Sequence, residues 1–198
     1  MGIFELPEGY AEIKRVNFQK NKKLALFLNV GAAVILIAFF FIGVQFVPFS
    51  FSIDAENLTS ALLNLIKVLL HLFGMLLSIF LYITAHELVH GIYIKKYSGQ
   101  KAKYGFTGMY AYAGSDAYFN KRQYIVIALA PVVLFGLAFF LLMLLLPQEW
   151  FWHIYLLQMM NLSGAVGDLY ITGLICRLPS DVLTTDKGVE MAMYSRVE

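Results

Sequence analysis

Four long runs of hydrophobic residues, separated by short polar segments, dominate the pattern of this chain. They cover residues 24–47, 61–94, 124–146 and 150–176. A helix of about 20 apolar residues crosses the roughly 30 Å of hydrocarbon in a bilayer, so each run is long enough to span a membrane. The pattern therefore predicts an all-α membrane protein with four transmembrane helices, forming a single membrane-embedded domain over residues 1–198.

The polar segment between the second and third runs has an alternating pattern. Tyr104 and Phe106 alternate with small or charged residues before Gly108, and Tyr110 and Tyr112 do so after it. This pattern predicts a short β-hairpin-like loop between the second and third helices. Such a hairpin can add an extended substrate strand to its edge, or it can simply cover a site from the cytoplasm. The sequence leaves both roles open.

Composition supports the membrane assignment, because 60% of the residues are hydrophobic and only 14% are charged, against roughly 25% charged residues in soluble domains. The formal net charge of +2 is too small to indicate a nucleic-acid partner. The single cysteine, Cys176, cannot form an internal disulfide. We therefore expect the lipid bilayer as a partner and no nucleic acid, and the oligomeric state is left open.

The basic residues predict the orientation of the chain. They lie before the first run, between the second and third, and after the fourth, whereas segments 48–60 and 147–149 contain no Lys or Arg. Positive charge gathers on the cytoplasmic side of short loops, so we expect both termini in the cytoplasm of a multi-pass protein of the bacterial cell membrane. The first run is too long for a cleaved signal peptide, which favours a retained anchor.

A His-Glu-x-x-His motif lies near the end of the second hydrophobic run. Residues four apart share one face of a helix, so His86 and His90 can present two imidazoles to one zinc ion. Glu87 points about 100° away from His86, which places its carboxylate beside the water that the zinc activates, as a general base requires. The alternative is a motif at the membrane interface whose polar groups are merely solvated.

Asp168 is the acidic residue that can reach the same depth as the motif. It lies nine residues before Arg177, and His86 lies nine residues before Lys95. Both groups are thus roughly 13 Å from the cytoplasmic rim of basic residues, at about 1.5 Å per residue. We expect Asp168 to be the third zinc ligand, with a polar contact between helices as the alternative.

Three other polar residues of the hydrophobic runs are weighed for a role. Asn161 lies nearly two helical turns before Asp168 on the same face, so its amide can contact a substrate or a transition-state oxygen, or form a hydrogen bond between helices. His71 lies about 22 Å along the helix from His86, too far to share its metal. His153 belongs to an aromatic belt at the outer interface, and neither histidine is assigned a role.

These motifs resemble those of a small bacterial membrane family of zincin peptidases, and more distantly the site-2 protease group of intramembrane zinc metalloproteases. The resemblance covers residues 61–176 and rests on HELVHG, the hairpin-like loop, Ala130-Pro131 and the segment NLSGAVGD. In the site-2 group a later helix supplies an aspartate ligand, which the resemblance assigns to Asp168. This chain differs from the site-2 pattern at Gly164 and Leu169, where that pattern has Pro and Gly.

The expected function is therefore a zinc-dependent membrane metalloprotease that hydrolyses peptide bonds of membrane-associated proteins near the cytoplasmic face. Its partners would be a membrane protein or peptide substrate and Zn²⁺. Two other classes of protein stay open. One is a non-catalytic scaffold or client-binding protein that retains the metal site. The other is a haem-binding electron-transfer bundle, for which His153 would be the partner of a histidine on the second helix.

Overall fold

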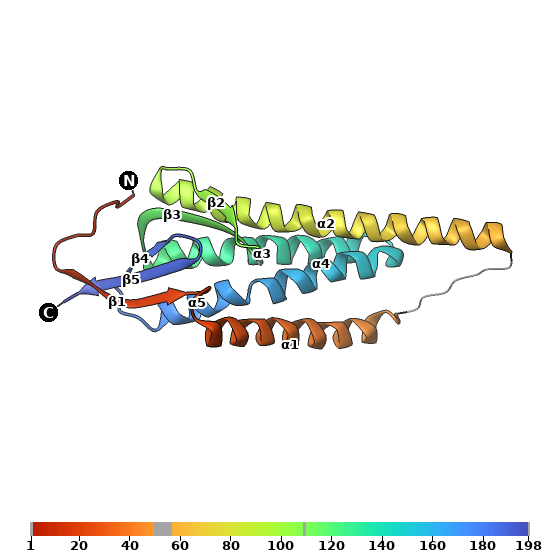
Figure 1. The fold of residues 1–198 in the computed structure, drawn as a ribbon, viewed down its shortest axis with the longest axis horizontal. Coiled ribbons are helices and arrows are strands. Elements are labelled where there is room, and N and C mark those ends of the chain that lie inside the picture. Colours follow the sequence, from red (N-terminus) through yellow and green to blue (C-terminus); the bar gives the residue numbers. More distant parts are fainter. Residues whose placement is uncertain (1, 50–56, 109, 198) are drawn as a thin grey trace.

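The computed structural model describes residues 2–49, 57–108 and 110–197 and shows an elongated molecule, with helices side by side along most of its length and a β-sheet at one end (Figure 1). Both termini lie at the sheet end. The helical elements are α1 (Lys22–Phe46), α2 (Leu58–Ser98), α3 (Lys121–Leu145), a short 3-10 helix η1 (Gln148–Trp150), α4 (Phe151–Gly164) and α5 (Val166–Cys176).

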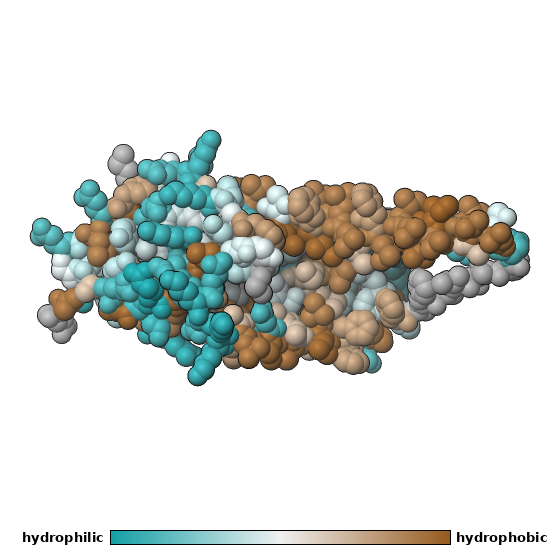
Figure 2. Space-filling view, in the orientation of Figure 1, coloured by the Kyte–Doolittle hydropathy of each residue, from teal (hydrophilic) through white to brown (hydrophobic). Residues whose placement is uncertain are grey.

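Four helical segments of the described residues are long and apolar enough to cross a membrane. They are Lys22–Phe46, Leu58–Ser98, Lys121–Leu145 and Gln148–Cys176, in agreement with the four runs of the sequence. Hydrophobic side chains cover the helical part of the molecule, and hydrophilic side chains gather over the sheet end (Figure 2). This distribution is consistent with a multi-pass membrane protein.

Side-chain caps explain where two of the helices begin. Asn57 and Ser60 form a capping box at the start of α2, and Asn120 and Gln123 form the same arrangement at the start of α3. Each box satisfies backbone N–H groups that have no partner within the helix. Helix α2 ends at Gly99, whose positive φ of 79° is the left-handed conformation that glycine adopts at low cost.

The fourth hydrophobic run is divided into two helices, whereas the sequence predicted one continuous helix over residues 150–176. Helix α4 ends at Gly164, Ala165 has φ −82° and ψ 9°, and α5 begins at Val166. Gly164 and Gly167 flank the break, and glycine is a poor helix former. The consequence is that Asp168 lies in the first turn of a new helix.

The predicted fold class is wrong about the β-structure, because the structure has a five-stranded antiparallel sheet and not just a short hairpin loop. Its strands are β1 (Tyr10–Asn17), β2 (Lys103–Phe106), β3 (Ala111–Asn120), β4 (Leu183–Asp186) and β5 (Glu190–Arg196). Their order in the sheet is β1-β5-β4-β3-β2. The chain is thus a helical bundle with a sheet, and the all-α description does not hold.

Pairing between remote segments explains why local patterns missed the sheet. Strands β2 and β3 pair as the expected hairpin, with Tyr104 opposite Ala113. Strand β3 then continues and pairs with β4 near the C-terminus, and β5 pairs with β1 near the N-terminus, where Val16 faces Met191. Strands β1 and β5 do not alternate strictly between polar and apolar residues, so they carry no clear period-2 pattern of their own.

One face of the sheet packs on the ends of α2, α3 and α5. Side chains from these helices, from strands β1, β3 and β5, and from the residue just before β4 share one hydrophobic core, which includes Val16, Ile94, Phe119, Tyr124, Ile127, Ile171, Ile175, Val182, Met191 and Met193. The packing of this core joins the sheet to α2, which carries the motif, and to α3 and α5. The sheet therefore lies beside the end of the bundle that contains His86 and His90.

Candidate metal centre

Helix α2 runs without interruption through the His-Glu-x-x-His motif, so the two histidines lie one turn apart on one face. Their ring centroids are 4.9 Å apart, and each residue is only 8% exposed. Helix α2 packs against α3, α4 and strand β3. Both imidazoles therefore point into the protein and away from lipid.

Asp168 approaches the same point from α5. Its Oδ2 atom lies 3.5 Å from Nε2 of His86 and 3.7 Å from Nε2 of His90. Within the described part of the chain, these three residues form the group whose ligand atoms all lie within 4.8 Å of one another. The structure thus brings together the three residues that the sequence singled out as ligands.

The second ring nitrogen of each histidine has a hydrogen-bond partner. Nδ1 of His90 lies 2.8 Å from the backbone carbonyl oxygen of Ile127 in α3, and Nδ1 of His86 lies 3.1 Å from the hydroxyl of Tyr82. A carbonyl oxygen only accepts, so His90 carries its proton on Nδ1. The Nε2 atoms of both rings are then directed at Asp168, the arrangement typical of metal-ligating histidines.

The protonation of His86 follows from a chain of hydrogen bonds through Asn161. The Asn161 amide nitrogen donates to the carbonyl oxygen of Val132 at 3.0 Å, which leaves its Oδ1 to accept from the Tyr82 hydroxyl at 3.0 Å. The single hydroxyl proton of Tyr82 is then used, so His86 must donate from Nδ1. In its neutral form each histidine therefore carries its proton on Nδ1 and presents an unprotonated Nε2.

The geometry fits a zinc ion. Two imidazole nitrogens and one carboxylate oxygen, with a fourth position left for water or substrate, match the donor sets of catalytic zinc sites. Ligand atoms at about 2.0–2.2 Å from a tetrahedral ion are separated by roughly 3.3–3.6 Å. The distances of 3.5 and 3.7 Å to the Asp168 oxygen are close to that range.

Glu87 lies between the two histidines in the sequence and is partly buried. It directly follows His86 in α2, and its carboxylate is near enough to interact electrostatically with His86, His90 and Asp168. A carboxylate in this position can accept a proton from a water that attacks a substrate.

Asn161 is completely buried, with 0% of its surface exposed. Its two hydrogen bonds, to Tyr82 of α2 and to Val132 of α3, connect three helices. The hydrogen bond between helices that the sequence left open is therefore present. Contact of Asn161 with a substrate stays a prediction.

Two polar groups near the candidate ligands could not be predicted from the sequence pattern. One is the carbonyl oxygen of Ile127, which only the packing of α3 on α2 brings to His90. The other is Asp186 of β4, which accepts hydrogen bonds from the Tyr124 hydroxyl and from the Gly188 N–H. Burial raises the pKa of the Asp186 carboxyl above its ordinary value, and these two hydrogen bonds offset only part of that rise. The charge of Asp186 also interacts with those of His90 and Asp168. Asp186 is thus a further acidic residue near enough to interact electrostatically with the candidate ligands.

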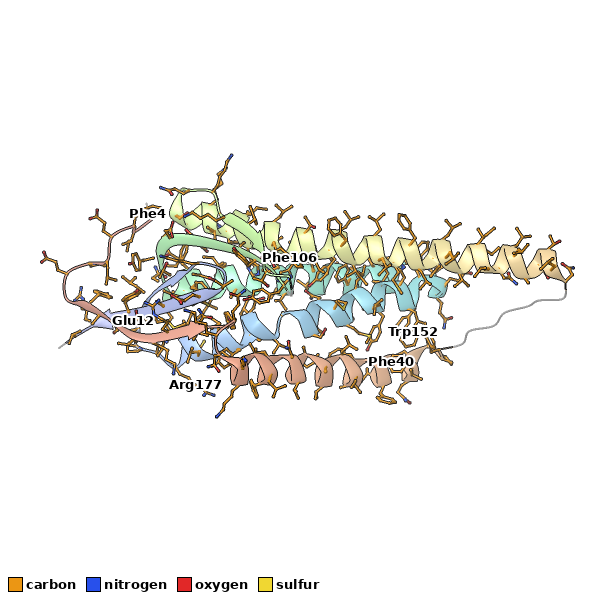
Figure 3. The ribbon with its side chains drawn as sticks, in the orientation of Figure 1. Phe4, Glu12, Phe40, Phe106, Trp152 and Arg177 are labelled. Carbon is orange, nitrogen blue, oxygen red and sulfur yellow. The ribbon has the colours of Figure 1, made fainter. Side chains whose placement is uncertain are left out.

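Strand β2, at one edge of the sheet, lies next to the motif. Gly91 follows His90 directly, and a Cβ atom on it would lie 1.8 Å from the hydroxyl oxygen of Tyr104 in β2. Glycine at this position therefore allows β2 to approach α2. Phe106, also in β2, is 72% exposed and lies where the sheet meets the helices (Figure 3).

His71 and His153 lie together, away from the motif. Their ring centroids are 6.1 Å apart, and Nε2 of His153 is 3.0 Å from the hydroxyl of Ser78. At the same end of the bundle Phe40 of α1 packs on Trp152 of α4, with ring centroids 5.7 Å apart (Figure 3). These contacts are those of an aromatic cluster, and the two histidines again receive no role.

Two histidines on one helix, a carboxylate from another and an adjacent glutamate define the class of zinc metallopeptidase sites. Comparison with protein families agrees with this class. The chain belongs to the family described as "Putative zincin peptidase", whose model matches residues 79–183. The matched segment contains the motif, Asn161 and Asp168. The family supports a metallopeptidase that uses zinc.

The chain is also similar to an "uncharacterized 24.7 kDa protein in gap 5'region" of Pyrococcus woesei. The two are 30% identical over 122 residues, which is 59% of this chain and 53% of the relative. The chain thus spans about half the length of the curated relative it matches. No solved structure matches the chain. The resemblance to the site-2 protease group is not tested by these comparisons and stays a prediction.

Proposed function

We propose that this chain is a zinc-dependent membrane metallopeptidase that hydrolyses peptide bonds of membrane-associated proteins near the cytoplasmic face. One observation carries the proposal: Nε2 of His86, Nε2 of His90 and Oδ2 of Asp168 converge from two helices, and Glu87 directly follows His86 in one of them. An ionisable group in a membrane helix costs about 2.5–3.5 kcal/mol on insertion scales. Four such groups at one point indicate a function that offsets this cost.

The residues divide the chemistry between binding and proton transfer. His86, His90 and Asp168 would hold the ion. When bound, zinc supplies a Lewis acid that acidifies water and polarises a substrate carbonyl. The Glu87 carboxylate accepts the proton of the attacking water and delivers it to the nitrogen of the leaving amine.

The sheet gives an extended substrate a place to bind. Strand β2 is at the edge of the sheet, beside the end of α2 that carries the motif, and Tyr104 and Phe106 are 52% and 72% exposed. An edge strand presents unpaired N–H and C=O groups that can pair with an extended peptide. A substrate paired there would present its peptide bonds in an extended form, which a membrane helix does not.

Replacing Glu87 by Gln tests the proposal most directly. The purified protein, in detergent or reconstituted in vesicles, is incubated with solubilised membrane proteins, and new N-termini are identified by mass spectrometry. General acid–base catalysis contributes about 10²–10⁴-fold, so Glu87→Gln should lower the rate of cleavage at least about 100-fold. Its zinc content, measured by plasma mass spectrometry, should equal that of the wild type. Glu149→Gln makes the same chemical change in exposed η1 at the opposite end and should cleave normally.

Two results would contradict the proposal. One is a wild-type protein without stoichiometric zinc whose behaviour does not change when His86 and His90 become Ala. The other is full client binding and unchanged phenotype in Glu87→Gln, which would favour the non-catalytic scaffold. A Soret band in the purified protein would instead indicate the haem-binding class.

The membrane orientation has its own test. We infer that both termini are cytoplasmic, since the sheet pairs β1 with β5 and the basic residues lie at the same end. Fusions of a fluorescent protein to either terminus should fluoresce, and fusions of a periplasmic phosphatase there should be inactive. Active phosphatase at either terminus would refute this orientation.

A further inference from the structure

The carbonyl group that holds His90 is available because of a proline. Helix α3 contains Pro131, and a proline has no N–H to donate to the carbonyl four residues earlier. That carbonyl belongs to Ile127. Its oxygen is the atom that lies 2.8 Å from Nδ1 of His90. The Ile127 oxygen thus has no N–H partner at residue 131 of α3, and the same oxygen is the one that contacts His90.

An unpaired backbone carbonyl is expensive in a membrane, where no water is present to satisfy it. Proline is tolerated in such helices when a neighbouring group restores the missing hydrogen bond. Here the imidazole N–H of His90 does so, from the facing helix. Ala128, one residue after Ile127, is 1% exposed, and its small side chain allows α2 and α3 to approach closely.

The contact fixes both the protonation and the direction of the ring. A carbonyl oxygen only accepts, so the proton of a neutral His90 must be on Nδ1. Nε2 is then free of a proton and lies 3.7 Å from Oδ2 of Asp168. Without Pro131, the N–H of residue 131 would bond to the Ile127 oxygen, direct it along the helix and compete with His90 for it.

We propose that Pro131 is a positioning residue of the metal centre, which frees the Ile127 carbonyl to hold His90 in the tautomer that binds metal through Nε2. The inference rests on the proposed metal site. It assigns to the proline a role beyond bending α3. Hydrogen bonds of this kind to metal-ligating histidines are typically worth 10–100-fold in metal affinity.

The test compares the wild type with Pro131→Ala and with Val133→Ala, a control on the lipid-facing side of the same region of α3, where Val133 is 55% exposed. The affinity for Zn²⁺ is measured by competition with a chromophoric chelator. Pro131→Ala should raise the Zn²⁺ dissociation constant about 10–100-fold, and Val133→Ala should leave it within about twofold of the wild type. An unchanged affinity in a folded Pro131→Ala protein would overturn the inference.

A spectroscopic measurement separates positioning from a merely structural role. With ¹⁵N-labelled histidine, the metal-free wild type should show His90 as the Nδ1–H tautomer, and Pro131→Ala should shift its population towards Nε2–H. An Nε2–H ring in the wild type would overturn the inference whether or not the variant folds. This readout needs neither metal nor catalysis, so failure of the inference is distinguishable from failure of the proposed peptidase activity.

Discussion

Replacing Asn161 by Leu should destabilise the protein through the chain of hydrogen bonds behind His86. The substitution keeps the branched shape of this fully buried side chain but removes its hydrogen bonds to Tyr82 and Val132, both 3.0 Å long. Hydrogen bonds between membrane helices average about 0.6 kcal/mol and reach about 1.7 kcal/mol. Leaving the Tyr82 hydroxyl proton without an acceptor costs about 1–3 kcal/mol. Because these two ranges overlap between about 1 and 1.7 kcal/mol, we expect a loss of about 1–2 kcal/mol.

The free energy of unfolding would be measured on metal-free protein in mixed micelles, with increasing sodium dodecyl sulfate and tryptophan fluorescence as the signal. Asn29→Leu, the same change at an exposed position of α1, should stay within about 0.5 kcal/mol of the wild type. A double-mutant cycle with Tyr82→Phe should show a coupling of about 1 kcal/mol, because phenylalanine has no hydroxyl to leave unsatisfied. Coupling near zero would refute the hydrogen-bond chain that we use to assign the proton of His86.

Three further predictions concern the sheet and the metal. Gly91→Ala should lower the free energy of unfolding by about 1–3 kcal/mol, because its Cβ would lie 1.8 Å from the Tyr104 hydroxyl and 2.7 Å from the adjoining ring carbon. Gly74→Ala is the control on the same helix: its Cβ would meet no atom of another element within 4 Å, so it should show no such loss in the same unfolding assay. The backbone N–H of Arg196 and the Ser195 hydroxyl lower the pKa of Asp181 below its ordinary 3.8, so the stability that this carboxylate contributes is present above that pH and lost below it. The wild type should therefore melt at a higher temperature than Asp181→Asn at about pH 6, and a difference that does not shrink towards about pH 3 would contradict this cause. Free Zn²⁺ at a hundred times its dissociation constant should stabilise the wild type by about 2.7 kcal/mol, and a chelator should reverse the gain; an equal effect of Zn²⁺ on the His90→Ala variant would mean that it binds elsewhere.

Sequence patterns alone were sufficient for the long helices and for three residues of the candidate site. Membrane-spanning helices form from continuous local hydrophobicity, and their backbone hydrogen bonds are internal, so they are visible without knowledge of their neighbours. The motif of His86, Glu87 and His90 is equally local, because the helical repeat sets its geometry. Asp168 could be proposed from its depth relative to the basic residues, because the sequence predicted the same direction for both hydrophobic runs.

Tertiary structure decided the features that depend on remote segments. The pairing of β1 with β5, and of β3 with β4, joins strands far apart in the sequence, so no local pattern predicts it. The break between α4 and α5 at Ala165 could not be predicted, because hydrophobic residues continue on both sides of it.

The same holds for the hydrogen bonds around the candidate ligands. The sequence by itself determined which residues can bind metal, because ligand chemistry and helical spacing belong to individual residues and to one helix. Only the packing of α3 against α2 and α4 decided how those ligands are held, since the Ile127 and Val132 carbonyl oxygens become acceptors for side chains of other helices only in the folded protein.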